Sequence, residues 1–154
     1  MKYYIAYGSN LSVEQMAHRC PDAKIIGRAS LKNWKLVFKV HATIEPEEGS
    51  VVPVLVWQIS DRDEQRLDRY EGFPKYYIKQ NMTVKVNPLR GNKPVEVNAM
   101  VYIMTNIRGI TPPSTTYYLT IREGYKRFGF NTDILSNAFT DAFIQYEPQT
   151  ASNI

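Results

Sequence analysis

Two short segments of the chain carry residue types suited to binding an anion and to moving a proton. The first is the tetrapeptide Gly8-Ser9-Asn10-Leu11, which ends the strand-like run Lys2–Tyr7 just before a helical pattern. Successive backbone N–H groups at the start of a helix attract anions, because the helix dipole is positive there. The tetrapeptide lacks the Gly-Lys-Ser/Thr ending of a Walker loop and the glycine spacing of a dinucleotide site. An anion site and an ordinary strand-to-helix turn are both open interpretations of it.

The second segment is centred on Glu71. The pattern predicts that this residue lies at the C-terminal end of a short helix that Gly72 stops. The negative end of the helix dipole and partial desolvation beside Tyr70 and Phe73 both disfavour a charged carboxylate, so we expect its pKa to be raised. Such a carboxyl group can accept a proton and return it near neutral pH. The alternative is an exposed helix-end glutamate without a chemical role.

The other residues with reactive side chains lack partners at a suitable spacing. His18 and His41, the only histidines, lie far apart, and no Cys/His/Asp cluster has metal-ligand spacing, so we expect no bound metal. Ser9 has no evident histidine partner and no G-x-S-x-G motif around it. Cys20 falls on the apolar face of the first predicted helix, where a buried packing thiol is expected.

Strands and helices that must position these residues are mixed along the chain. Strand-like runs occur at Lys2–Tyr7, Trp34–Val40, Val51–Ile59, Tyr76–Val86 and Val95–Met104. Helical patterns begin near Ser12, at Asp61 and Glu64, after Ser114, and at Asn131 or Thr132. Turn residues predict an acidic hairpin-like loop over 45–49 and a hairpin over 87–94. Without a βαβ period or a repeat, the pattern predicts an α+β fold with a strongly curved or closed sheet, and leaves closure open.

Length and composition predict one soluble domain over residues 1–146, followed by a polar C-terminal tail over 147–154. The chain has 154 residues, of which 44% are hydrophobic and 22% charged. A single cysteine and the absence of an apolar leader run predict a cytoplasmic protein. The most apolar stretch, Val51–Trp57, is shorter than the roughly 18 residues that a membrane span needs, so no membrane association is expected.

A basic stretch raises the question of nucleic-acid binding. Its members are Lys24, Arg28, Lys32, Lys35 and Lys39. Apolar and basic residues alternate between positions 34 and 40, which is typical of a half-buried strand with a solvated face. We therefore expect no nucleic-acid partner, and we interpret the net charge of +4 as solubility or a modest attraction for an anionic small molecule.

Taken in order, several segments resemble the γ-glutamylcyclotransferase-like family. They are the run Tyr4–Leu11, Gly27-Arg28 leading into Trp34–Phe38, Leu67–Pro74 with Tyr77 after it, and Pro113-Ser114 with Tyr117 and Gly124. The resemblance extends over roughly residues 3–145, nearly the whole chain. The tyrosine-glycine-serine-asparagine start paired with the later Leu-Asp-x-x-Glu-Gly is the specific part.

The resemblance implies an α+β fold, a small mixed β-barrel flanked by helices, and a cofactor-independent enzyme. Family members cyclise a γ-glutamyl amide to 5-oxoproline and release an amine or amino acid. It further implies that Glu71 is the catalytic general base and acid. The residues that it implies for substrate binding are Tyr7, Gly8, Ser9, Asn10, Leu11, Tyr77 and Tyr117. Tyr76 is adjacent to Tyr77, and the Pro-x-x-Tyr-x-basic pattern selects Tyr77 with Lys79.

The chemistry of that reaction agrees with the residues present. The α-amine of a γ-glutamyl amide can attack its own δ-carbonyl carbon, so no side-chain nucleophile is needed. One glutamate with a raised pKa can take a proton from the amine and return it to the leaving nitrogen. The leaving group stays open between an amino acid, the ε-amine of lysine and an aminoglycoside. We expect a small γ-glutamyl substrate as the partner of a monomer or homodimer. The alternative is a non-catalytic module that binds a small carboxylated metabolite.

Overall fold

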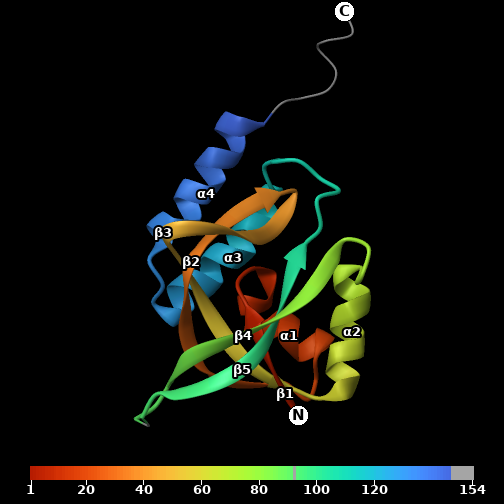
Figure 1. Ribbon diagram of the computed structural model, residues 1–154, viewed down its shortest axis with the longest axis vertical. Coiled ribbons are helices and arrows are strands. Elements are labelled where there is room, and N and C mark those ends of the chain that lie inside the picture. The colour runs from red at the N-terminus through yellow and green to blue at the C-terminus, as the bar shows by residue number, and fades with distance from the viewer. Residues whose placement is uncertain (92, 147–154) are drawn as a thin grey trace, which may run out of the picture.

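A closed barrel of five strands forms the centre of the computed structural model, which describes residues 1–91 and 93–146 (Figure 1). The strands follow one another around the barrel in the order β1-β3-β2-β4-β5, and β5 pairs with β1 in parallel. Their bounds are β1 Lys2–Ala6, β2 Lys24–Lys39, β3 His41–Ile59, β4 Tyr77–Pro88 and β5 Val95–Met104. The expectation of a small mixed β-barrel is confirmed. The polar tail expected over 147–154 lies outside the described residues.

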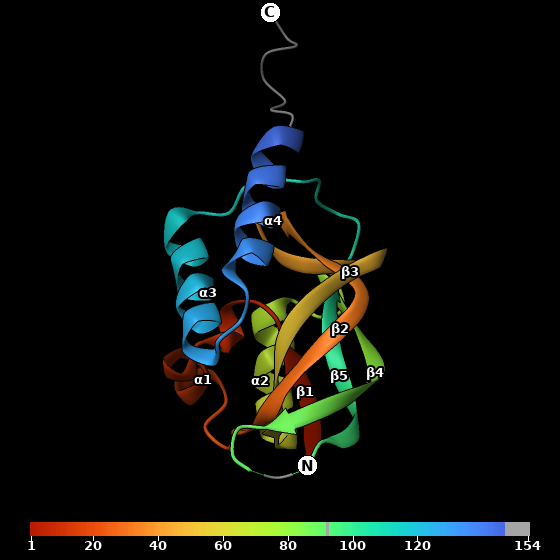
Figure 2. The ribbon, with the colours of Figure 1, turned by 90° about the vertical axis from the view of Figure 1, so that its left-hand side faces the viewer.

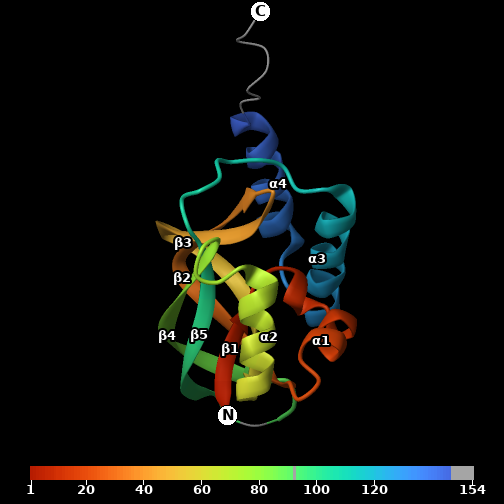
Figure 3. The same ribbon diagram turned by 90° about the vertical axis from the view of Figure 1, so that its right-hand side faces the viewer.

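Helices flank the barrel on two sides. Their bounds are η1 Ser9–Leu11, α1 Val13–Arg19, α2 Asp61–Glu71, α3 Thr115–Phe128 and α4 Thr132–Gln145. Figure 3 shows α2 beside β1 on one side of the barrel, whereas Figure 2 shows α3 and α4 along a different side. The helix α4 packs on β2, and α3 packs on η1. No helix among the described residues is both long enough and apolar enough to cross a membrane.

The cap residues of α2 determine where Glu71 lies. The Ser60 hydroxyl accepts a hydrogen bond from the Asp63 N–H at 3.1 Å, and the Asp63 carboxylate accepts one from the Ser60 N–H at 3.3 Å. This reciprocal capping box makes Ser60 the N-cap, so the helix begins at Asp61 as predicted, but the cap suggested at Asp61 and Glu64 is wrong by one position. The predicted stop is confirmed, because Gly72 adopts the left-handed conformation with φ 68°. Glu71 is therefore the last residue of the helix.

The second and third predicted strands form one long hairpin. Strands β2 and β3 pair antiparallel from Lys24 opposite Gln58 to Lys39 opposite His41. The chain reverses at Val40, whose φ is 69°. Val40 donates its N–H to the Thr111 carbonyl at 3.0 Å, which holds this unusual turn in place.

The acidic hairpin-like loop predicted over 45–49 is wrong, because these residues lie inside β3. They fall opposite a register shift in β2 near Asn33. The Asn33 side-chain oxygen accepts a hydrogen bond from the Gly49 N–H at 3.0 Å, so the extra residues of β3 bulge outward and the pairing continues beyond them. The turn between β2 and β3 is instead the one at Val40, and it places the start of β3 at one end of the barrel.

Two residues of the basic stretch on β2 lie beside acidic side chains of β3. Lys39 is buried and lies 3.0 Å from a Glu45 oxygen, and Lys35 lies 3.5 Å from Glu47. The predicted half-buried strand with a solvated face is wrong here, because residues 36–39 are all buried; buried and exposed residues alternate instead over 27–32. The prediction for Cys20 is confirmed, since its thiol is buried and this burial raises the pKa to about 12.

Strands β2 and β4 close the barrel through a very short pairing. Gly27 lies opposite Pro88, and Arg28 lies opposite Asn87. A Cβ atom built on Gly27 would lie 2.3 Å from the Asn87 carbonyl oxygen. Closure at this seam therefore requires a residue without a side chain.

Candidate active site

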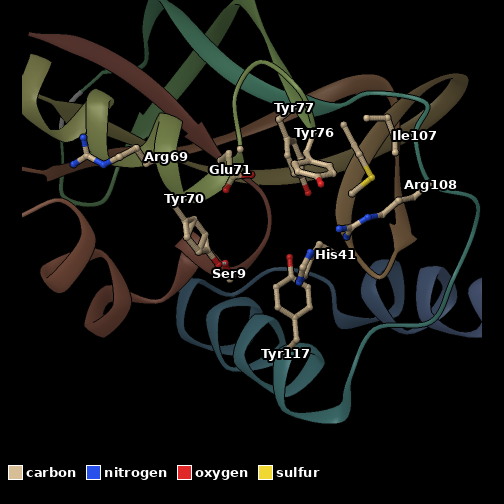
Figure 4. Close-up of a pocket in the computed structure, with 12 residues that line it drawn as sticks. Ser9, His41, Arg69, Tyr70, Glu71, Tyr76, Tyr77, Ile107, Arg108 and Tyr117 are labelled. Atoms are coloured by element: carbon tan, nitrogen blue, oxygen red, sulfur yellow. Dashed lines mark hydrogen bonds between the residues drawn. The ribbon is translucent and has the colours of Figure 1, made fainter.

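A cavity opens at the end of the barrel where β1 meets η1 (Figure 4). Its outer part, here called the outer cavity, has a volume of about 370 Å³. The outer cavity is lined by Ser9, His41, Arg69, Tyr70, Glu71, Gly72, Tyr76, Tyr77, Met104, Ile107, Arg108 and Tyr117. An inner recess of about 30 Å³ adjoins it and is lined by Tyr4, Ile5, Tyr7, Gly8, Ser9, Asn10, Ala42, Glu71, Tyr77, Tyr102 and Tyr117.

Most residues singled out in the sequence meet in this cavity. Four of them line both parts: Ser9, Glu71, Tyr77 and Tyr117. Tyr7, Gly8 and Asn10 line the inner recess only. Leu11 lines neither part, because its side chain is fully buried in the core. The residues come from η1, α2, β4 and α3, so the cavity forms only when the barrel and its helices are assembled.

Glu71 has the perturbed acidity that its position predicts. Burial at the end of α2 raises the pKa of its carboxyl group to about 7, although the Arg19 charge lowers it in part. In Figure 4 the carboxyl group faces the cavity from the helix end, across from Tyr117 and His41. At neutral pH the group is therefore divided between its acid and base forms, as proton transfer in both directions requires.

Arg19, which the sequence analysis did not single out, links the loop to the helix end. Its guanidinium donates to the Asn10 side-chain oxygen at 2.5 Å and to the Ser9 hydroxyl at 3.3 Å. The same group lies 3.5 Å from the centroid of the Tyr70 ring, a cation–π contact. Its one signal in the sequence is a basic residue in the last turn of the first predicted helix.

The loop after β1 keeps part of its backbone open for a ligand. Among the described residues, no protein acceptor pairs with the N–H groups of Gly8, Ser9 and Asn10. The N–H of Leu11 donates to the Gly8 carbonyl oxygen at 3.0 Å, which closes the 3₁₀ turn. The expectation that Leu11 also offers its amide to a ligand is therefore wrong. Three consecutive amides beside the recess remain suited to an anion.

The hydroxyl groups of two tyrosines form hydrogen bonds with Ala42, one with its carbonyl oxygen and the other with its N–H group. The Tyr77 hydroxyl donates to the Ala42 carbonyl oxygen at 2.8 Å, which leaves its oxygen free to accept. The Tyr117 hydroxyl accepts from the Ala42 N–H at 3.1 Å, which leaves its proton free to donate. Tyr76 is at the rim, 37% exposed, so Tyr77 is the buried member of the adjacent pair.

Polar side chains under α2 hold the helix against the barrel. Lys79 on β4 contacts Glu64 at 2.8 Å and Asp68 at 2.8 Å. The buried Tyr102 on β5 donates its hydroxyl to Asp68 Oδ1 at 2.6 Å, the same oxygen that Lys79 contacts. Because Asp68 lies one helical turn before Glu71, these contacts fix the helix end from which the carboxyl group enters the cavity.

Gly124 on α3 supports the loop from behind. A Cβ atom built there would lie 2.5 Å from the Leu11 Cβ. Alanine in place of glycine normally stabilises a helix interior by about 1 kcal/mol. Here we expect Gly124→Ala to destabilise the protein by about 1–3 kcal/mol, the usual cost of overpacking. Urea denaturation measures the change, with Gly109→Ala, whose Cβ would meet nothing within 4 Å, as the control. A stability gain for Gly124→Ala would contradict the close contact.

The fold and the cavity together define the class of protein: a β-barrel protein whose cavity can bind an anion and transfer a proton. A closed barrel carries a small-molecule cavity at one end, with open backbone amides in its inner recess and a carboxyl group of near-neutral pKa beside them.

Comparison with known proteins places the chain more narrowly. The family model described as "Gamma-glutamyl cyclotransferase, AIG2-like" matches residues 4–124. A Mus musculus protein named Gamma-glutamylcyclotransferase is 33% identical over 138 residues, which cover 82% of this chain and 71% of that protein. The Homo sapiens protein of the same name is 32% identical over 142 residues, with the same coverage. A solved structure named "Gamma-glutamyl cyclotransferase" superposes with a TM-score of 0.76 at 27% identity, over 98% of this chain and 90% of the other. The chain belongs to the gamma-glutamyl cyclotransferase, AIG2-like family.

Proposed function

We propose that this protein is a γ-glutamylcyclotransferase that converts a γ-glutamyl amide to 5-oxoproline and a free amine, with Glu71 as the general base and acid. The observation that carries the proposal is the carboxyl group of Glu71, with a pKa of about 7, beside three open amides in one recess. The family match supports the same reaction.

The inner recess of about 30 Å³ receives the α-carboxylate of the substrate, and the rest of the glutamyl group extends toward the outer cavity. The α-carboxylate binds the N–H groups of Gly8, Ser9 and Asn10, and this contact fixes the neighbouring α-amine relative to the δ-carbonyl carbon. The α-ammonium group then faces the carboxylate of Glu71 and the accepting oxygen of Tyr77. A five-membered ring closes only from a folded conformation, so holding that conformation removes much of the entropic barrier.

The bond changes follow from this placement. Glu71 takes one proton from the α-ammonium group, and the freed amine attacks the δ-carbonyl carbon. The spare proton of Tyr117 can stabilise the negative charge that develops on the carbonyl oxygen. Glu71 then returns its proton to the leaving nitrogen as the amide C–N bond breaks. The second ammonium proton passes to water as the ring nitrogen becomes an amide, and the released amine takes up one proton from water, so the protons balance. The products are 5-oxoproline and an ammonium ion.

The direct test is release of 5-oxoproline from a panel of γ-glutamyl compounds. The panel contains γ-glutamyl-alanine, γ-glutamyl-ε-lysine and a γ-glutamyl aminoglycoside. We expect 5-oxoproline from at least one of them without an added metal or cofactor. A ligand-induced rise in Tm without any product would instead support a binding module.

The pKa of Glu71 predicts the pH dependence of the reaction. Because the base form must be present in the free enzyme, we expect kcat/KM to rise with pH through about 7 and then to level off. Arg19→Gln removes the charge that lowers this pKa, so the rise should move to higher pH. The control is Arg69→Gln, on the exposed face beside the helix end, which should leave the midpoint in place. An unchanged midpoint in Arg19→Gln would argue against Glu71 as the titrating group.

A further inference from the structure

Arg108 is a cation at the outer end of the cavity that has no ion-pair partner among the residues that the structure describes. It lies on the segment between β5 and α3, and its side chain is half-buried while its neighbours Ile107 and Gly109 are exposed. Its guanidinium lies 5.2 Å from the centroid of the Tyr76 ring. Within residues 1–91 and 93–146 it makes no ion pair and no side-chain hydrogen bond. The aromatic contact therefore holds the guanidinium over the cavity with its donors unused.

The charged side chains of the cavity lining are distributed unevenly along its length. Glu71 is the acidic residue of the lining, and the arginines of the lining are Arg69 and Arg108. Figure 4 shows the guanidinium of Arg69 turned away from the cavity, whereas that of Arg108 reaches toward His41 and the middle of it. Burial and, after it, the Arg108 charge lower the pKa of His41, and the Arg108 charge also acts on Tyr77, whereas Arg19 is the charge that lowers the pKa of Glu71. The Arg108 charge thus acts on His41 and Tyr77 of the lining, and Arg19 is the charge that acts on the carboxyl group of Glu71.

The proposed orientation of the substrate places its leaving group near the guanidinium of Arg108. With the α-carboxylate at the inner amides and the scissile amide beside Glu71, the leaving group extends into the outer cavity of about 370 Å³. A guanidinium presents a planar fork of N–H donors that matches a carboxylate. A cationic leaving group would meet repulsion at the same place, and a neutral one would leave the donors unused.

We propose that Arg108 binds a carboxylate on the leaving group and so selects γ-glutamyl amides of amino acids over those of neutral or cationic amines. This inference rests on the proposed function for the orientation of the substrate. It adds a residue that separates leaving groups with a carboxylate from those without one and takes no part in proton transfer.

Two substrates of equal size test the proposal. γ-Glutamyl-alanine carries the carboxylate, and γ-glutamyl-alaninamide replaces it with a neutral amide. For the unmodified protein we expect kcat/KM for 5-oxoproline release to favour γ-glutamyl-alanine by about tenfold or more, as expected for a charge-assisted hydrogen bond. In Arg108→Gln the ratio should fall to about one. Arg108→Lys, which keeps the charge without the planar fork, should give an intermediate ratio.

Arg69→Gln is the matched control, since it removes an arginine whose guanidinium points away from the cavity. It should keep the preference for γ-glutamyl-alanine. A ratio near one in the unmodified protein, or a preference that survives in Arg108→Gln, overturns the proposal. Thermal melts confirm that each variant is folded.

A binding measurement separates this proposal from the proposed function. In Glu71→Gln the two compounds can be titrated by calorimetry without turnover, and the Kd ratio should again depend on Arg108. If the unmodified protein releases no 5-oxoproline from these two compounds or from any member of the panel above, the proposed function fails, and the Kd ratio still decides the role of Arg108. Equal Kd values for the two compounds reject the carboxylate contact.

Discussion

Replacing Glu71 by glutamine is expected to lower kcat for 5-oxoproline release by about 10²- to 10⁴-fold, the usual contribution of general acid–base catalysis. Glutamine keeps the size of the side chain but cannot take a proton from the α-ammonium group. The carboxyl group is the acid of the cavity lining, so no other side chain there replaces it. The measurement is steady-state release of 5-oxoproline near pH 8, where Glu71 is mostly ionised.

Glu48→Gln is the matched control, because Glu48 is an exposed residue of β3 in the outward bulge, away from the cavity lining. It should retain the activity of the unmodified protein. Undiminished turnover in Glu71→Gln would refute the assignment of this residue as the proton carrier.

The same substitution has a defined effect on stability. The carboxyl group of Glu71 has a pKa of about 7 in the folded protein, above its ordinary value of 4.5. The unfolded chain therefore releases this proton at lower pH, so the folded protein loses stability as the pH rises from about 4.5 to about 7. Glutamine does not titrate. The Tm of Glu71→Gln, measured relative to the unmodified protein, should therefore be higher at pH 8 than at pH 5, which shows that lost activity does not reflect unfolding.

The second large effect is expected at the seam of the barrel, where Gly27→Ala should destabilise the protein by about 3 kcal/mol. The new Cβ would lie 2.3 Å from the Asn87 carbonyl oxygen and 2.8 Å from its carbonyl carbon. Both are backbone atoms, so the strands must separate to make room. Because β2 and β4 pair only at Gly27–Pro88 and Arg28–Asn87, a small separation removes their hydrogen bonding.

Urea denaturation measures this change through the midpoint at constant m. Ser30→Ala on the same strand is the control, since Ser30 is exposed, and its change should stay within about 0.5 kcal/mol. A Gly27→Ala variant as stable as the unmodified protein would show that the seam has room for a side chain.

Local patterns predicted those parts of the fold that depend on neighbouring residues. The stop at Gly72 and the cap at Ser114 are fixed within a few residues, and both were placed correctly. The turn at Val40 was missed because a β-branched residue rarely adopts a positive φ. It is held there by Thr111, which is far away in the sequence and close only in the fold.

The same distinction applies to the cavity. Glu71 and residues 8–11 carry recognisable local motifs, whereas Arg19 and Arg108 gain their positions from tertiary contacts with Tyr70 and Tyr76. The direction of a hydroxyl group is also a tertiary property. Tyr77 and Tyr117 differ in which backbone group of Ala42 they bind, and no spacing in the sequence contains that information.

The parallel pairing of β5 with β1 has a consequence for how the protein acquires activity. It joins Tyr3 to Ala99, and the cavity further needs Tyr117 on α3. During synthesis, the loop after β1 therefore leaves the ribosome long before the strand and helix that complete its surroundings. Folding through such distant contacts is slow compared with that of helical bundles. We expect nascent chains that stop before α3 to be inactive, and catalytic activity to appear in a single late step together with barrel closure.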